Sequence, residues 1–149
     1  MKIVMIGAGN VATHLGMALQ KSGHDVMQVY SRTEESARAL ADKLGCRFTT
    51  SIAEVLPDAT LYIVSVKDDA LASLLPQLTA RNADALFVHT AGSVSIDVWS
   101  GLTRRYGVLY PMQTFSKQKK VDFRTVPCFV EASDKHTLDI IMELARLLS

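Results

Sequence analysis

Two glycines directly follow the first apolar run of the chain, and this feature constrains the fold more than any other. The run Lys2–Ile6 is short and rich in β-branched residues, as buried strands are. The stretch GAGNVA, Gly7 to Ala12, comes next, and apolar residues at helical spacing follow it until Ser22-Gly23. Strand, glycine turn and helix in this order predict the start of a βαβ unit whose turn lies close to a ligand.

Strand and helix patterns alternate along most of the 149 residues. Further strands are predicted at 25–30, 46–49, 60–66, 85–89, 106–110 and 127–130, and helices at 33–44, 68–78 and 134–148, with short helices after Ser51 and over 95–102. Ser31 and Glu34 have capping-box spacing, and Gly45 is expected to end the 33–44 helix. We therefore expect one α/β domain over residues 1–149. Its sheet should be doubly wound, mostly parallel and of the Rossmann type, with helices on both faces and strand order 3-2-1-4-5-6.

The glycine turn has the residues that a dinucleotide requires. Gly7 can adopt the angles of a tight turn, Gly9 has no side chain to block a pyrophosphate, and Ala12 allows close packing of helix on sheet. The helix that starts at Asn10-Val11 directs backbone N–H groups and its positive dipole end at the phosphates. The cofactor-binding residues expected here are Gly7, Ala8, Gly9, Asn10, Val11 and Ala12. A glycine turn without a ligand, or one of the methyltransferase type, remains an alternative.

The end of the second predicted strand indicates which dinucleotide binds. About 20 residues past the glycine turn, an Asp or Glu would bind the ribose 2′-hydroxyl of NAD. The chain has Ser31-Arg32-Thr33 there, a guanidinium between two hydroxyls, which suits a 2′-phosphate. We therefore expect NADP(H) rather than NAD(H). The alternative is that the hydroxyls only cap the next helix while Arg32 is solvated, and both roles can hold together.

The ends of the fourth and fifth strands should lie at the same sheet edge, where ligands collect. Cofactor contacts are expected from Ser65, Val66, Lys67, His89, Thr90 and Ala91. Lys67 and His89 are weak candidates for proton transfer. A solvated lysine and a histidine bonded to backbone are the commoner roles at such positions.

The motifs along the chain are similar to those of a known superfamily. They are GAGNVA, YSRT, YIVSVKDDAL, HTAGS (His89–Ser93), YPMQTFS (Tyr110–Ser116) and PCFVE (Pro127–Glu131). The first three resemble pyrroline-5-carboxylate reductases and deazaflavin-dependent NADP oxidoreductases. The last three resemble more closely a group of Rossmann-like proteins with a C-terminal domain of unknown function.

This resemblance implies an NADP-binding half of an oxidoreductase that transfers hydride to or from a small molecule. A non-catalytic nucleotide-binding or sensing module is the alternative. Members continue into a helical domain that closes over the substrate and forms dimers. This chain stops at Ser149, where that domain should begin, so we expect it to be part of a longer protein.

The closing helix, 134–148, has an apolar arc of roughly 220°, wider than one sheet face requires. We expect homo-oligomers through this C-terminal region, with Leu144 and Leu147 among the contacts. The alternative is that the segment 115–123 covers the surplus apolar surface.

Charge and composition exclude other classes. A net charge of +1 gives no electrostatic case for nucleic acid, and no apolar stretch reaches the roughly 18–20 residues that span a bilayer. The start of the chain does not resemble a signal peptide, so we expect a cytoplasmic protein. Cys46 and Cys128 fit no metal spacing and are expected to be buried free thiols; no metal site is expected.

Overall fold

A seven-stranded sheet forms the centre of the computed structural model, which describes residues 1–112 and 127–148. The strand order is β3-β2-β1-β4-β5-β6-β7. The strands are β1 (Lys2–Ile6), β2 (Asp25–Tyr30), β3 (Arg47–Thr49), β4 (Leu61–Val64), β5 (Leu86–His89), β6 (Arg105–Pro111) and β7 (Cys128–Ala132). β1 to β6 pair in parallel, and β7 joins β6 antiparallel at the edge. The predicted doubly wound sheet and its strand order are confirmed.

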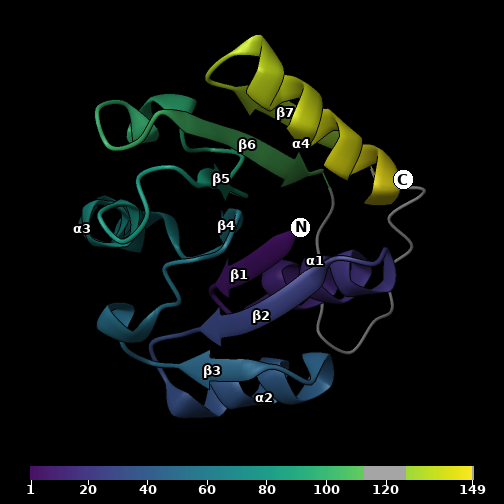
Figure 1. The fold of residues 1–149 in the computed structure, drawn as a ribbon, viewed down its shortest axis with the longest axis vertical. Helices are drawn as coiled ribbons and strands as arrows, with labels where there is room; N and C mark the ends of the chain where they lie inside the picture. Colours follow the sequence, from purple (N-terminus) through teal and green to yellow (C-terminus); the bar gives the residue numbers. More distant parts are fainter. Residues whose placement is uncertain (113–126, 149) are drawn as a thin grey trace.

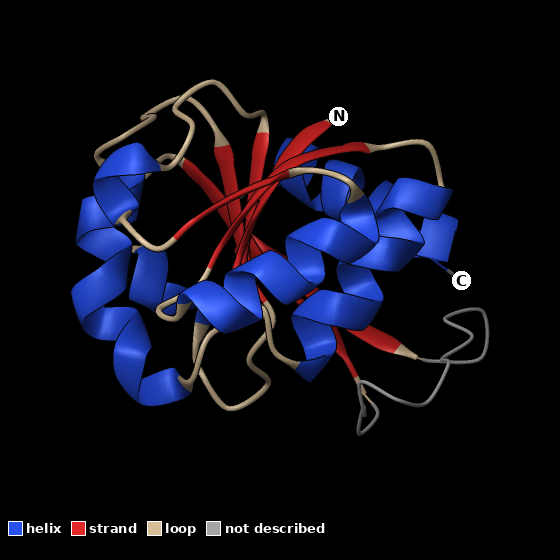
Figure 2. Ribbon diagram, turned by 90° about the horizontal axis from the view of Figure 1, so that it is seen from below, coloured by secondary structure: helices blue, strands red, loops and turns tan. Residues whose placement is uncertain are grey.

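Helices cover both faces of the sheet (Figure 2). The α-helices are α1 (Asn10–Lys21), α2 (Glu34–Leu44), α3 (Asp68–Thr79) and α4 (Lys135–Leu148), and two short 3-10 helices are η1 (Ile52–Glu54) and η2 (Ile96–Trp99). α1, α2 and α4 share one buried apolar cluster, and α3 and η2 share the other. Figure 1 shows β3 with α2 at one end of the twisted sheet and β7 with α4 at the other.

Period-2 alternation on β4 explains why both faces are apolar. Leu61 and Ile63 belong to the cluster under α1, α2 and α4, whereas Tyr62 and Val64 belong to the cluster under α3. All four are buried, as the continuous apolar run of a central parallel strand requires. Among the described residues, no helix is long and apolar enough to cross a membrane.

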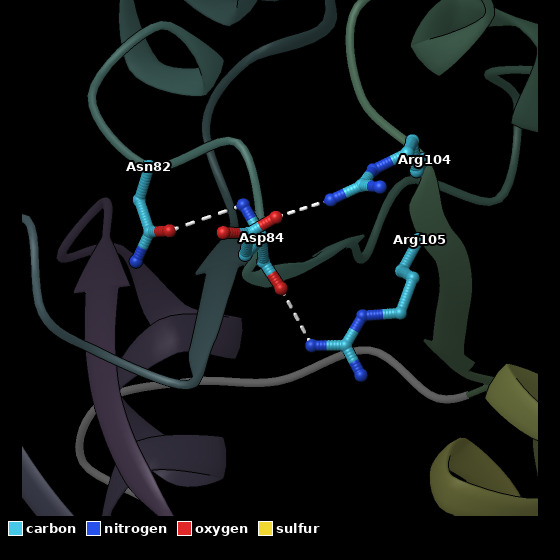
Figure 3. Close-up of polar contacts among 4 residues, drawn as sticks. All are labelled: Asn82, Asp84, Arg104 and Arg105. Atoms are coloured by element: carbon cyan, nitrogen blue, oxygen red, sulfur yellow. Dashed lines mark hydrogen bonds and ion pairs between the residues drawn. The ribbon is translucent and has the colours of Figure 1, made fainter.

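Polar contacts join the loops at the edge where the parallel strands begin (Figure 3). Asn82 accepts a hydrogen bond from the backbone of Asp84 at 3.2 Å and donates one to the Ala59 carbonyl at 3.1 Å. Arg105 donates to the Asp84 carbonyl at 2.6 Å, and Arg104 forms an ion pair with the Asp84 carboxylate. These contacts join the loop before β5 to the start of β6.

Three local predictions need correction. Thr33, not Ser31, caps α2, because its hydroxyl accepts a hydrogen bond from the Ser36 amide; Gly45 ends the helix in the left-handed region, as predicted. The 95–102 segment forms only the short η2 helix. Cys46 and Cys128 are half-buried rather than buried.

The C-terminal helix uses much of its apolar surface within the chain. Ile141 and Leu144 of α4 are 0% and 1% exposed and belong to the cluster shared with α1 and α2. Leu144 therefore cannot contact a second copy, contrary to the sequence expectation. The side chain of Leu147 and the segment 115–123 lie outside the described residues. Met142 is 40% exposed on the same helix.

Gly107→Ala should destabilise the fold by about 1–3 kcal/mol, because a close-packed interior does not accommodate added atoms. A Cβ at Gly107 would lie 2.5 Å from the backbone oxygen of Glu131 in β7 and would also clash with Ile141 of α4. The matched control is Gly16→Ala in α1, whose Cβ would lie 3.4 Å from Leu44, and there alanine should be neutral or stabilising. Urea unfolding of both variants measures the difference, and equal stabilities would contradict the packing described.

Candidate functional site

The turn between β1 and α1 lies at the point where the sheet reverses its winding, between β1 and β4. Gly7 has a φ of +113°, and a Cβ there would clash with the backbone carbonyl of Ser65 just after β4, lying 2.8 Å from its carbon. The Gly7 amide donates to the Tyr30 carbonyl at the end of β2, at 2.7 Å. Glycine is therefore required at position 7 by the fold itself.

Gly9 has no comparable structural requirement. It precedes α1 with a φ of −79°, which any residue can adopt, and a Cβ there would meet no atom within 4 Å. The Thr13 hydroxyl donates to the Gly9 carbonyl at 2.7 Å and fixes the turn. Ala12 of α1 is fully buried in the cluster between the helix and the sheet, as predicted. The open space at Gly9, in front of the first amides of α1, is what a pyrophosphate group needs.

Three hydroxyls cluster at the end of β2. The Ser36 hydroxyl lies 2.6 Å from the hydroxyl of Ser31 and 2.6 Å from that of Thr33. Arg32 is exposed between them in sequence, and its guanidinium makes no hydrogen bond or ion pair with any residue that the structure describes. Sequence reasoning missed Ser36; its position three residues after the capping Thr33 is the signal that could have identified it.

The loops after β4 and β5 are joined by side chains. The Thr90 hydroxyl donates to the Ser65 hydroxyl at 3.0 Å, and the Ser93 hydroxyl donates to the Asp68 carboxylate at 2.7 Å. Lys67 is exposed at the start of α3. The structure thus brings the predicted residues of both loops to one edge, and it adds Asp68 and Ser93.

His89 does not reach the surface of this edge. Its side chain is fully enclosed, its Nδ1 accepts a hydrogen bond from the Ala91 amide at 3.1 Å, and its ring stacks on Trp99. Burial lowers the pKa of His89, against smaller opposing effects of the Ser95 backbone, Asp68 and Glu131. The imidazole is bonded to backbone, and the direct contact with cofactor or substrate that the sequence suggested does not fit its enclosure.

Gly92 and Tyr110 bring together two of the motifs that carried the resemblance. A Cβ at Gly92 would lie 2.6 Å from Cζ of the Tyr110 ring, so this ring packs directly on the glycine backbone. Tyr110 is the last residue but one of β6, and the motif continues over 113–116, outside the described residues. Sequence reasoning did not predict this contact.

A hollow of about 460 Å³ lies at the opposite edge of the sheet, where β2 and β3 begin. Asp25, Cys46, Arg47 and Asp58 are among its lining residues. No residue predicted to bind the cofactor lines it. The residues expected from the sequence lie at the other ends of the strands.

These features define a class of protein: a doubly wound α/β domain with a dinucleotide-type glycine turn at the reversal between β1 and β4. Comparison with family models then identifies the family. Residues 2–93 match the model described as NADP oxidoreductase, coenzyme F420-dependent. The chain belongs to this family, which confirms the superfamily expected from the motifs.

Solved structures support the same assignment. A Bacteroides fragilis protein described as a candidate NADP oxidoreductase is 53% identical to this chain. The match covers 99% of the present chain, with a TM-score of 0.97. The prephenate dehydrogenase of Aquifex aeolicus (18% identical, TM-score 0.84) and a pyrroline-5-carboxylate reductase of Coxiella burnetii (21% identical, TM-score 0.78) share the fold over 100% and 99% of the chain. The chain spans only 57%, 57% and 56% of the lengths of these three proteins. No curated protein sequence matches it significantly.

Gly9→Val should leave the fold intact and largely abolish binding of NADPH. Valine tolerates the backbone angles at position 9, but its side chain would occupy the space in front of the helix amides. Met17→Val, on an exposed position later in the same helix, is the matched control. Fluorescence titration with NADPH measures both. Unchanged affinity in Gly9→Val would contradict the placement of the pyrophosphate.

Proposed function

We propose that this chain is the NADP(H)-binding part of an oxidoreductase that transfers hydride to or from a small-molecule substrate. The observation that carries the proposal is the glycine turn. Packing on Ser65 explains why position 7 is a glycine. At position 9 an added Cβ would meet no described atom within 4 Å, so packing within the chain does not explain the glycine there. Family membership supports the oxidoreductase class. When bound, the nicotinamide supplies the hydride chemistry, and the chain supplies binding and orientation.

The choice of NADP over NAD rests on the end of β2. Arg32 is exposed without a partner among the described residues, next to the hydroxyl cluster of Ser31, Thr33 and Ser36. A guanidinium and hydroxyls at the start of α2 favour a dianionic 2′-phosphate by charge-assisted hydrogen bonds and by the helix dipole. No carboxylate occupies the position that would bind the ribose hydroxyls of NAD.

The substrate is expected beside the nicotinamide, at the carboxyl edge of the sheet. Lys67 is exposed at this edge and can exchange protons with a substrate there. Ser65, Val66, Thr90 and Ala91 line the same edge as expected contacts for the nicotinamide half. Catalytic groups from a region beyond residue 149 are compatible with the longer relatives.

A non-catalytic nucleotide-binding or sensing module is the second candidate. The enclosure of His89 favours it, because this removes one of the two proton-transfer candidates from the surface of the site. Oxidation of bound NADPH during a screen of small imines, ketones and deazaflavins separates the two. Turnover supports the oxidoreductase, and tight binding without turnover by the full-length protein supports the module.

Association between copies through the C-terminal region is part of the proposal, as is a cytoplasmic location. Met142 is the large apolar residue exposed on α4 in the part of the helix whose side chains are described, and this expectation rests on it. Met142→Glu should lower the molar mass seen by light scattering at high concentration, and a monomer unaffected by the change would contradict association through this helix.

Arg32→Ala should weaken NADPH binding by about 10–150-fold, because a charge-assisted hydrogen bond to phosphate contributes roughly 1.5–3 kcal/mol. NADH affinity should change little. Arg104→Ala removes an arginine from the opposite edge of the sheet and should affect neither cofactor. Calorimetric titration of each protein with both cofactors tests this. Equal losses for NADPH and NADH would show that Arg32 does not bind the 2′-phosphate.

A further inference from the structure

The buried imidazole of His89 has one defined hydrogen bond, and the bond fixes its protonation state. Nδ1 accepts from the Ala91 amide at 3.1 Å, so Nδ1 cannot carry a proton. The neutral ring must therefore hold its proton on Nε2, which is an enclosed atom. His89 is thus a buried, titratable group whose acceptor atom faces the loop that follows β5.

The ring is held rigidly in this orientation. It stacks on the indole of Trp99, with ring centroids 6.1 Å apart and an angle of 25° between the planes. Trp99 is itself fully buried, and its indole nitrogen donates to the Gly107 carbonyl in β6 at 3.1 Å. The stacking and the enclosure therefore hold the plane of the imidazole beside the Ala91 amide.

The loop that the imidazole contacts is part of the carboxyl edge of the sheet. Within it, Thr90 bonds to Ser65 and Ser93 bonds to Asp68, which ties the loop after β5 to the loop after β4. These two bonds involve hydroxyls and an exposed carboxylate. Only the bond from Ala91 to His89 depends on a group that titrates close to neutral pH.

We propose that His89 is a positioning residue, which acts through the Ala91 amide to hold the Thr90–Ser93 loop where the nicotinamide half of NADP(H) binds. The inference rests on the proposed function, since it assigns the loop to the nicotinamide end of the site. His89 touches neither cofactor nor substrate in this role. If Nδ1 were protonated, its N–H would face the N–H of Ala91. Two donors cannot form a hydrogen bond, so the loop would have to move.

The direction of the pH effect follows from the surroundings of the ring. Burial lowers the pKa of His89 below its usual 6.5, and the Ser95 backbone, Asp68 of α3 and Glu131 of β7 oppose this shift. The neutral ring is thus favoured in the folded chain. The loop is held at neutral and alkaline pH and is released as the pH falls below about 6.5 through the lowered pKa of His89.

The test compares NADPH with 2′-phospho-ADP-ribose, which carries the 2′-phosphate and the pyrophosphate but lacks the nicotinamide. The 2′-phosphate titrates near pH 6 in both ligands, so the ratio of the two affinities removes its contribution. Both ligands are titrated into the wild-type chain between about pH 5 and about pH 8. His89→Asn keeps an oxygen acceptor that does not titrate, and His89→Leu fills a similar volume without an acceptor.

A neutral hydrogen bond contributes about 0.5–1.5 kcal/mol, which corresponds to a roughly two- to twelvefold change in affinity. The affinity for NADPH relative to 2′-phospho-ADP-ribose should fall by this factor at acidic pH in the wild type. It should stay high at every pH in His89→Asn and low at every pH in His89→Leu. A pH-independent ratio in the wild type, or wild-type behaviour of His89→Leu, would overturn the positioning role alone. Failure of the wild type to bind either ligand would overturn the proposed function and the inference with it.

A measurement without nucleotide and without substitution completes the test. The ring nitrogens of His89 and the amides of Thr90, Ala91 and Ser93 are followed by NMR as the pH is lowered. The inference predicts an Nε2-protonated neutral ring at neutral pH and loop amides that shift with the same midpoint as the ring. Loop amides whose chemical shifts do not change as His89 titrates would overturn the inference.

Discussion

The packing of the Gly7 backbone on the Ser65 carbonyl is the contact on which the rest of the site depends. It joins the ends of β1 and β4, the two neighbouring strands between which the sheet reverses its winding. Only a residue without a Cβ, at a φ of +113°, allows this approach. The chain then leaves β1 toward α1 with Gly9 and the first helix amides facing outward. One close backbone contact therefore both holds the ends of β1 and β4 together and directs the turn at a ligand.

Two clusters of charged and polar residues at opposite edges of the sheet differ in their partners. At the edge where the strands begin, Asn82, Asp84, Arg104 and Arg105 bond to one another and to backbone. At the opposite edge Arg32 lacks such a partner among the described residues, and Lys67 is exposed. Exposed cationic groups beside the glycine turn are what an anionic ligand at this edge requires.

The elements, their order and the glycine turn could be predicted because they depend on local periodicity and on backbone sterics. Gly7 and Ala12 have the roles that the spacing indicated, and Gly45 ends α2. The enclosure of His89, the Ser36 hydroxyl and the packing of Tyr110 on Gly92 could not be predicted, because each depends on which elements meet in space. Leu144 was misassigned for the same reason: the helical pattern shows an apolar arc, but not how much of it β6, β7 and α1 cover.

The central claim is that the dinucleotide binds at the carboxyl edge, around the glycine turn. A backbone-amide NMR titration of the chain with NADP⁺ tests it most directly, because it reports every site at once. The account predicts shifts at Asn10–Ala12, Ser31–Ser36 and Thr90–Ser93. Shifts confined to Asp25, Arg47 and Asp58, around the hollow of about 460 Å³ at the other edge, would contradict it.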